Sequence, residues 1–339
     1  MSALLANALT MGEPSGIGAE ITLKTWRDHR SDVSPFFIID NPDRLRQIAN
    51  TFEIDVPIVE IDDPKRASQE FHDALPVIPL QNDVHATLGE PDAINSKAVL
   101  ESIERCVEYT LAGQAAAVVT NPIQKETLYK SGFNFPGHTE FLAELVEGNP
   151  NPVMMLASPM LRVVPVTVHM SLRHALDTLT TELIIEHGKI VIDALRNDFG
   201  IDTPRLTVAG LNPHAGEAGA LGDEDANVVL PAISILQAYG AHVYGPVPPD
   251  ALFTERARMG YDAALCMYHD QALIPIKALD VDRAVNTTLG LPIVRTSPDH
   301  GTAIDIAAKG IAQPSSLIAS MKMASEIAQH RVNRLGSIS

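Results

Sequence analysis

Three histidines stand where short apolar segments end, and their type and placement predict metal chemistry. His169 follows RVVPVTV, His214 follows RLTVAGLNP, and His269 follows AALCMY. Neutral imidazole binds Zn²⁺ and other first-row divalent metals, and three protein ligands with an open position are typical of a catalytic site. The spacing contains no local motif of the HExxH kind. Three unrelated histidines, each satisfied by hydrogen bonds, are therefore the alternative.

A metal at these histidines would suit the oxidation of an alcohol. Coordination lowers the pKa of water from about 15.7 to about 7, and a bound secondary alcohol should be acidified in the same sense. Asp250 and Asp270 are candidates to orient the imidazoles, although for Asp250 the capping of a turn is an equal alternative. We expect one divalent cation per site, with Zn²⁺ the best match to imidazole and Mg²⁺, Mn²⁺ or Co²⁺ as alternatives.

The segments that must position these residues alternate between short apolar runs and longer helical patterns. This alternation predicts an α/β fold with a mostly parallel sheet flanked by helices, in which ligands bind beyond the carboxyl ends of strands. Helical periodicity marks 181–198, and a last helix is expected at about 315–333. One strand end leads into Asn121 to Lys125, another into Gly12 to Gly18. The predicted strands are 4–11, 36–40, 115–120, 153–157, 162–169, 205–212, 242–245 and 263–268.

Bulk properties exclude several classes of protein. The 339 residues fit two α/β domains or one large one. A formal charge of −17 argues against nucleic acid or an anionic membrane as the main partner, because both would be repelled. Neither a signal peptide nor a membrane-spanning stretch is expected, and Cys106 and Cys266 suggest neither a disulfide framework nor a thiolate metal site. We expect a cytoplasmic protein.

Six blocks of sequence, spread over nearly the whole chain, carry a family resemblance. They are GEPSGIGAE (12–20), GHTEF (137–141), LNPHAGEAG (211–219), MYHDQALIPIK (267–277), NTTLGLP (286–292) and RTSPDHGTAIDIA (295–307). In this order they resemble the successive motifs of the 4-hydroxythreonine-4-phosphate dehydrogenases of vitamin B6 synthesis. The resemblance implies the two-domain fold of isopropylmalate dehydrogenase, with the active site in the cleft between the domains. We expect a cofactor-side domain of residues 1–135 plus 285–339, and a metal, substrate and dimerisation domain of residues 136–284.

The resemblance also implies a reaction and an assembly. The reaction would be NAD-dependent oxidation and decarboxylation of 4-phosphooxy-L-threonine to 3-amino-2-oxopropyl phosphate, in pyridoxine 5′-phosphate biosynthesis. The enzyme would be a homodimer whose metal site, built from the three strand-end histidines, is shared between subunits. The residues implied to bind this small phosphorylated substrate are His138, Thr139, Lys277, Asn286 and Arg295.

The implied substrate residues have a coherent chemistry. Lys277 and Arg295 supply fixed positive charge, and arginine can hold a phosphate or carboxylate through two parallel bonds. Solvated surface ion pairs are the alternative for both residues. Asp250, Asp270 and Lys277 are the predicted catalytic residues, and the proton acceptor is left open among Asp250, Asp270 and Lys125.

The dinucleotide site is not marked by a GxGxxG motif. The loop at 12–18 either lines the site through helix-terminus amides or is a tight turn, and Pro14 lacks the N–H of a phosphate cradle. Residues 300–305 resemble the adenosine-binding loop of isopropylmalate and isocitrate dehydrogenases; the alternative is a plain connection to the last helix. The predicted cofactor residues are Gly301, Thr302, Ala303 and Asp305, and a carboxylate at Asp305 favours NAD over NADP.

Some residues depart from the family pattern or are assigned no role in the chemistry. Ala218, Ala272 and Ala308 stand where the family commonly has glycine, and these changes remove no donor, acceptor or ligand. The acidic segment 222–225 is interpreted as helix capping. Solvated surface charge is the interpretation for Arg44, Arg46, Lys65 and Arg66.

Three other functions remain open at this point. Relatives of the family oxidise other hydroxy acids, including dihydrodiol carboxylates and sugar-acid phosphates. Phosphate acyltransferases have a similar fold but need neither the histidines nor a ribose-binding carboxylate. A metabolite-binding protein without catalysis would bind ligand without producing NADH.

Overall fold

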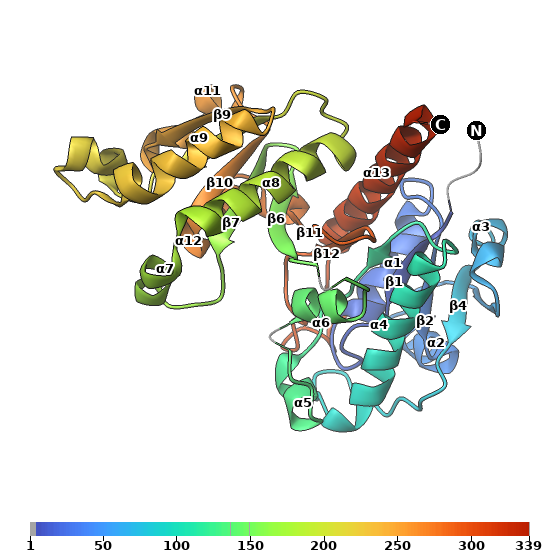
Figure 1. Ribbon diagram of the computed structural model, residues 1–339. Coiled ribbons are helices and arrows are strands. Elements are labelled where there is room, and N and C mark those ends of the chain that lie inside the picture. Colours follow the sequence, from blue (N-terminus) through green and yellow to red (C-terminus); the bar gives the residue numbers. More distant parts are fainter. Residues whose placement is uncertain (1–4, 136, 149, 339) are drawn as a thin grey trace. The chain divides into compact units, whose positions relative to one another are not determined.

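The structure, a computed structural model, describes residues 5–135, 137–148 and 150–338. The chain divides into two compact units, residues 1–152 with 291–329, and residues 153–290 with 330–339 (Figure 1). Leu4, in the first predicted strand, and Pro136, at a predicted domain boundary, lie outside the described residues.

Parallel strands form the sheet of the first unit. In spatial order they are β3 (Ile58–Glu60), β4 (Leu75–Pro79), β2 (Phe36–Asp40), β1 (Asn7–Thr10), β5 (Val118–Val119) and β12 (Arg295–Pro298). Every residue of β1, β2, β5 and β12 is buried. Burial of both faces is expected of parallel strands covered by helices on each side.

Helices cover this first sheet. They are α1 (Gly18–His29), α2 (Pro42–Thr51), α3 (Ala67–Glu70), α4 (Ser96–Leu111), α5 (Lys125–Lys130), α6 (His138–Glu144) and the short turns η1 (Pro64–Arg66) and η2 (Ala93–Asn95). The start of α2 follows from its sequence, because the Asn41 side chain accepts hydrogen bonds from the next free amides and Pro42 occupies the first position. Helix α4 packs on β1 and β2 (Figure 1).

The last helix, α13 (Ser315–Ile338), is tied to the first sheet by polar contacts. Asn7 Nδ2 donates to Ser325 Oγ at 2.8 Å, and the Thr296 hydroxyl donates to the Ser320 carbonyl at 2.9 Å. These bonds join α13 to β1 and β12, strands from opposite ends of the sequence. The helix predicted at 315–333 is confirmed.

The second unit has a mixed sheet. In spatial order its strands are β11 (Val285–Leu289), β6 (Val153–Ser158), β7 (Leu161–Thr167), β10 (Ala263–Tyr268), β8 (Arg205–Ala209) and β9 (His242–Val247). From β7 to β9 the pairing is parallel, whereas β6 pairs antiparallel with both β7 and β11. Because β11 pairs with β6, residues 285–290 lie in this unit. The domain boundaries predicted from the sequence had placed them in the cofactor-side domain.

Helices of the second unit include two that approach each other closely. They are α7 (Leu172–Thr178), α8 (Thr181–Asn197), α9 (Leu230–Ala238), α10 (Pro249–Leu252), α11 (Glu255–Arg258) and α12 (His269–Asp280), with the short turns η3 (Pro213–Gly219), η4 (Asp225–Val229) and η5 (Val281–Arg283). A Cβ at Gly188 of α8 would lie 2.5 Å from Leu236 Cδ1 of α9. A larger residue at this position would require the Leu236 side chain to shift.

The predicted α/β class and the predicted elements are confirmed. Each of the predicted strands has a counterpart, and the helix predicted at 181–198 is α8. The sequence did not predict β3, β4, β11 or β12. Within the described residues, no helix is long and apolar enough to cross a bilayer.

The loop after β8 has an unusual backbone. His214, Ala215, Gly216, Glu217 and Ala218 all have positive φ, with values of 53°, 52°, 80°, 43° and 54°. Each non-glycine residue in this left-handed region is destabilised by roughly 1–2 kcal/mol. The loop that carries His214 is therefore strained.

Replacing Ala218 by glycine should stabilise the protein by about 1 kcal/mol. Glycine adopts positive φ without strain, and the greater entropy of the unfolded glycine chain offsets only part of this gain. Chemical denaturation of both proteins measures the change. Ala308→Gly is the matched control, because Ala308 does not have positive φ; it should give no gain. A free energy of unfolding for Ala218→Gly at or below that of the wild type would contradict the strain argument.

Candidate functional site

His169 and His269 lie next to each other at the carboxyl ends of adjacent parallel strands. The register pairs Tyr268 of β10 with Thr167 of β7, and the two histidines follow within two residues of this pair. Their ring centroids are 5.9 Å apart. Both rings line a pocket of about 350 Å³. The other residues of this pocket are Thr167, Met170, Ser171, Leu172, Ala175, Tyr268 and Asp270.

Asp270 orients the ring of His269. The distance from His269 Nδ1 to Asp270 Oδ1 is 2.7 Å. A carboxylate at this nitrogen fixes the proton there and leaves Nε2 as the metal-binding nitrogen. This pairing of carboxylate and imidazole is the arrangement found behind metal-binding histidines.

His214 does not complete a three-residue group with the other two histidines among the described residues of this chain. It is exposed, at the start of the left-handed loop after β8. Across the part of the chain that the structure describes, no three His, Cys, Asp or Glu side chains are placed to hold one metal. The chain thus offers two neighbouring imidazoles, one of them oriented by a carboxylate. This donor set fits a nitrogen-preferring divalent metal as part of a site.

Asp250 is not part of the pocket that His169 and His269 line. It is exposed in the first turn of α10. A carboxylate in a first helical turn is stabilised by the helix dipole. Its position agrees with the capping alternative.

A buried cation and a neutral imidazole lie together in the first unit. Arg295, the first residue of β12, is 3% exposed, and its Nη2 donates to Thr120 Oγ1 at 2.7 Å. Burial lowers the pKa of Arg295 to about 10, opposed by the nearby Glu140 carboxylate. The guanidinium therefore remains charged at neutral pH.

His138, the first residue of α6, lies near this cation. Burial, and then the positive charges of Arg295 and Lys125, hold its pKa well below the usual range, so the ring is neutral at pH 7. Its Nε2 atom is buried and has no hydrogen-bond partner among the described residues. A buried polar atom without a partner is destabilising, so this nitrogen is available to form a hydrogen bond with a bound molecule. Thr139 follows on the same turn of α6.

The remaining predicted substrate residues belong to the second unit. Lys277 is exposed in the last turn of α12. Asn286 is on β11, and its buried Oδ1 is another atom for which the described residues supply no partner. The predicted substrate set is thus divided between the two units.

The predicted cofactor loop follows β12. Thr302 is buried, its hydroxyl donates to Gln124 Oε1 at 3.3 Å, and its carbonyl accepts from the Ile17 amide at 3.1 Å. A Cβ at Gly301 would meet nothing within 4 Å, and Asp305 is exposed. Open space at a glycine backbone and an accessible carboxylate fit the ribose of a dinucleotide.

The loop at 12–18 is a tight turn and not a phosphate cradle. The amide of Glu13 donates to the Pro122 carbonyl, and the Ser15 amide donates to Glu13 Oε1. The Gly16 amide donates to the Glu13 carbonyl, and the Ile17 amide to Thr302. Because these amides bond within the protein, they cannot hold a phosphate. The loop instead supports Thr302 of the predicted cofactor loop.

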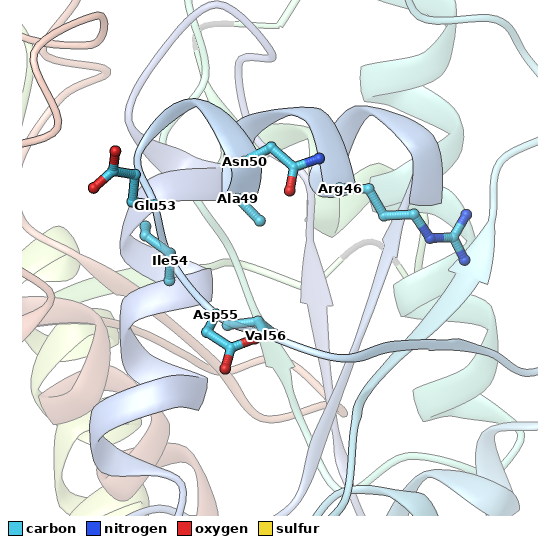
Figure 2. A pocket seen from close by; sticks show the side chains of 7 residues that line it. All are labelled: Arg46, Ala49, Asn50, Glu53, Ile54, Asp55 and Val56. Atoms are coloured by element: carbon cyan, nitrogen blue, oxygen red, sulfur yellow. The ribbon is translucent and has the colours of Figure 1, made fainter.

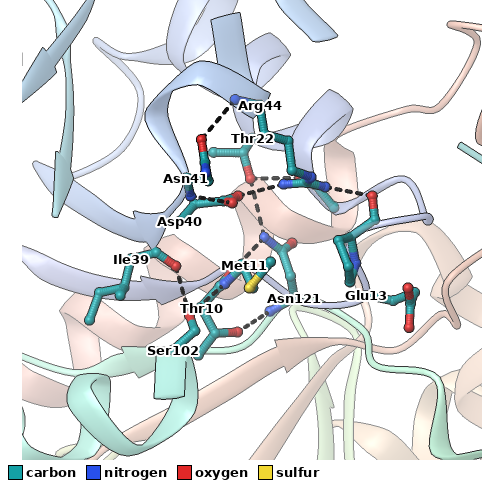
Figure 3. Close-up of polar contacts among 12 residues, drawn as sticks. Thr10, Met11, Glu13, Thr22, Ile39, Asp40, Asn41, Arg44, Ser102 and Asn121 are labelled. Atoms are coloured by element: carbon teal, nitrogen blue, oxygen red, sulfur yellow. Dashed lines mark hydrogen bonds and ion pairs between the residues drawn. The ribbon is translucent and has the colours of Figure 1, made fainter. Parts of the chain in front are cut away.

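Arg44 was interpreted from the sequence as a solvated charge, and that interpretation is wrong. Its side chain is 9% exposed and lies 2.7 Å from the fully buried Asp40 carboxylate. Its Nη2 also donates to the Pro14 carbonyl at 2.7 Å. Figure 3 shows Arg44 between Asp40 and the turn that contains Glu13. Arg44 therefore anchors the loop at 12–18. By contrast, Arg46 and Arg66 are about half exposed.

A second pocket lies elsewhere on the first unit. It has a volume of about 600 Å³ and contains none of the predicted site residues (Figure 2). Its lining is Arg46, Ala49, Asn50, Glu53, Ile54, Asp55 and Val56. Arg46 is engaged by Asp43 and Glu60, so the pocket offers no uncompensated cation for an anionic substrate.

Sequence reasoning missed two residues that support the site. Thr120 bonds Arg295, and Gln124 bonds Thr302. Both lie at the end of β5 or just beyond it, in a segment that the sequence marked as a polar strand end. That position was the available signal, but it did not reveal the partners.

Comparison with known proteins assigns the family. The model of the family described as pyridoxal phosphate biosynthetic protein PdxA matches residues 32–324. This chain belongs to the PdxA family. The 4-hydroxythreonine-4-phosphate dehydrogenase of Methylorubrum populi is 52% identical over 335 residues, which cover 97% of this chain and 96% of that protein. The PdxA resemblance that the six sequence blocks indicated is confirmed.

Solved structures of relatives have the same fold as this PdxA chain. The crystal structure of the 4-hydroxythreonine-4-phosphate dehydrogenase from Klebsiella pneumoniae is 39% identical, with a TM-score of 0.88, and the match covers 97% of this chain and 100% of that one. A terephthalate 1,2-cis-dihydrodiol dehydrogenase from Burkholderia xenovorans matches with a TM-score of 0.65 at 24% identity over 95% of this chain and 98% of that one. The second likeness shows a shared fold alone.

Proposed function

We propose that this chain catalyses the NAD-dependent oxidation and decarboxylation of 4-phosphooxy-L-threonine to 3-amino-2-oxopropyl phosphate. The observation that carries this proposal is the 52% identity, over 97% of the chain, to a protein named for the phosphorylated substrate. The buried Arg295 and the unpartnered Nε2 of His138 support it. A buried cation is stabilised when an anion pairs with it.

The proposed binding residues are of two kinds, positively charged and neutral. Arg295 and Lys277 supply positive charge for the phosphate and carboxylate of the substrate. His138, held neutral by burial and by nearby cations, contributes a directional hydrogen bond without adding charge. Asn286 and Thr139 contribute further directional bonds. Together they would recognise a small molecule that carries both anionic groups.

The proposed reaction has two steps. The hydrogen on C3 leaves as hydride to the nicotinamide of NAD⁺, and the hydroxyl proton passes to a base, so C3 becomes a ketone and NADH forms. The bond from C2 to the carboxylate then breaks, CO₂ leaves, and its electron pair forms an enolate that is protonated on carbon. A divalent cation, when bound, supplies the Lewis acidity that favours both steps.

The chain's own residues would hold this cation and move the proton. His169 and His269 supply imidazole nitrogens, and Asp270 keeps the His269 ring in the productive tautomer. The proton acceptor is one of Asp250, Asp270 and Lys125.

We further propose a homodimer in which the partner subunit's His214 completes each metal site. The solvent exposure of His214 supports this assembly, as does the finding that the described residues place it in no three-residue metal group. The exposed Asp305 supports NAD over NADP, because its carboxylate would repel a 2′-phosphate. A cytoplasmic location stays a prediction from the sequence.

Kinetics on the purified protein test the proposed function. With 4-phosphooxy-L-threonine and NAD⁺, we expect NADH and CO₂ to form in equal amounts. Removing the phosphate, as in 4-hydroxy-L-threonine, should lower kcat/KM about 100-fold, because charge-assisted bonds of about 1.5–3 kcal/mol each are lost. NADP⁺ should be the poorer cofactor. NADH from a dihydrodiol carboxylate, but none from the phosphorylated substrate, would overturn the proposal.

A further inference from the structure

We propose that Asp225 is a positioning residue that holds the loop carrying His214 in its metal-binding conformation. The inference rests on the proposed function, in which His214 is a metal ligand. The sequence interpretation placed this acidic segment at the start of a helix, and Asp225 does lie in the first turn of η4. Its carboxylate does not cap the helix that it begins, and it is 2% exposed.

The carboxylate of Asp225 reaches back to the end of β8. Oδ1 accepts from the Leu211 amide at 2.7 Å. Oδ2 accepts from the Asn212 amide at 3.0 Å and from Asn212 Nδ2 at 3.1 Å. Three N–H donors on one buried carboxylate fix the two residues that lead directly into Pro213 and His214.

Asp225 also lies beneath the far side of the same loop. A Cβ at Gly216 would lie 3.5 Å from Asp225 Cβ and 3.6 Å from Oδ2. The carboxylate thus contacts the backbone before His214 and closely approaches the backbone after it. Among the described residues, none forms a hydrogen bond with the His214 side chain, so its position depends on these neighbours.

The strain of this loop makes such an anchor necessary. Residues 214–218 all have left-handed backbone conformations. Conformations of this kind persist only where the surrounding structure fixes them. When the anchor is lost, the loop can relax toward ordinary φ values, which would redirect the imidazole of His214.

A second contact joins this loop to the strand end that carries His269. Gln271 Nε2 donates to the Gly210 carbonyl at 2.8 Å, and Gln271 Oε1 accepts from the Met267 amide at 2.6 Å. Gly210 directly precedes the residues that Asp225 holds. The end of β8 is therefore fixed both to the end of β10 and to Asp225.

The test is metal binding by the purified full-length protein. Asp225→Asn keeps the size of the side chain but replaces one acceptor oxygen by an NH2 donor, which then faces N–H donors of Leu211 and Asn212. Residues that orient metal ligands typically contribute 10–100-fold to metal affinity. We expect the Kd for Zn²⁺, measured by calorimetry, to rise by about that factor, while the Kd for NAD⁺ stays within about twofold of wild type.

Matched variants separate positioning from general destabilisation. Asp223→Asn changes an exposed carboxylate in the same segment, which contacts Asn227, and should leave both constants unchanged. Asn212→Ala removes one of the three donors and should weaken Zn²⁺ binding in the same direction but less. In the His214→Ala background, Asp225→Asn should cause no further loss of Zn²⁺ affinity, because Asp225 acts through His214.

Three outcomes are decisive. Wild-type Zn²⁺ affinity in Asp225→Asn, beside a loss in His214→Ala, overturns this inference and leaves the proposed metal site standing. A further loss caused by Asp225→Asn in the His214→Ala background also overturns it, because the effect would then be general. Undiminished Zn²⁺ affinity in His214→Ala removes the proposed role of His214 and this inference with it.

Discussion

Replacing His269 by alanine should remove the bound divalent metal and lower turnover of 4-phosphooxy-L-threonine by about 10³-fold. His269 lies beside His169, with ring centroids 5.9 Å apart, and its ring is oriented by Asp270. A catalytic metal stabilises developing charge in the transition state by several kcal/mol. A loss of about 4 kcal/mol corresponds to the expected 10³-fold decrease in turnover. Metal analysis of the purified variant, together with its NADH production, measures both effects.

His169→Ala should behave in the same way as His269→Ala. His174→Ala is the control, because His174 is exposed on α7 and is not one of the residues that line the pocket. It should retain metal and activity. Full metal content and turnover in both His169→Ala and His269→Ala would remove the metal from the proposed mechanism.

Replacing Arg295 by methionine should raise the KM for the phosphorylated substrate by about 10²- to 10³-fold without unfolding the protein. Two charge-assisted hydrogen bonds to an anion, of about 1.5–3 kcal/mol each, would be lost. Burial already opposes the charge of Arg295 and lowers its pKa to about 10. An apolar side chain of similar length removes that desolvation penalty but also removes the bond to Thr120, so the free energy of unfolding should change by no more than about 1–2 kcal/mol.

Steady-state kinetics and denaturation of the same preparation separate binding from stability. Arg283→Met is the control for KM, because this arginine is about half exposed and pairs with the buried carboxylate of Asp280; its KM should match the wild type. The wild-type KM should also rise as the pH passes about 10, where Arg295 loses its proton. An unchanged KM in Arg295→Met would exclude this residue from substrate binding, whatever its stability.

Much of the fold could be predicted from hydrophobic patterning. Strand β2 was predicted at its observed bounds because FFIID is a continuous apolar run that ends in a polar residue. Helix α8 was predicted because its apolar residues repeat with helical period and bury one face. In both, the burial pattern can be read directly from neighbouring residues.

The strands β11 and β12 could not be predicted in this way. Their sequences, VNTTL and RTSP, are largely polar, yet nearly all of their residues are buried. They are buried because distant groups satisfy them, as Thr120 does for Arg295 and the Ser320 carbonyl does for Thr296. Hydrophobicity carries no information about such partners.

The sequence by itself determined the family, the α/β class and which polar residues end the strands, because these depend on residue order and local periodicity. Only the tertiary structure decided which of those residues meet and which charges are buried. His169 meets His269 because β7 and β10 are neighbours in the sheet. Arg44 and Asp225 have the local sequence of surface charges, but each is buried by a loop that lies more than ten residues away in the chain. The state of a charged side chain depends on the groups that replace its water, and those groups are brought to it by the fold.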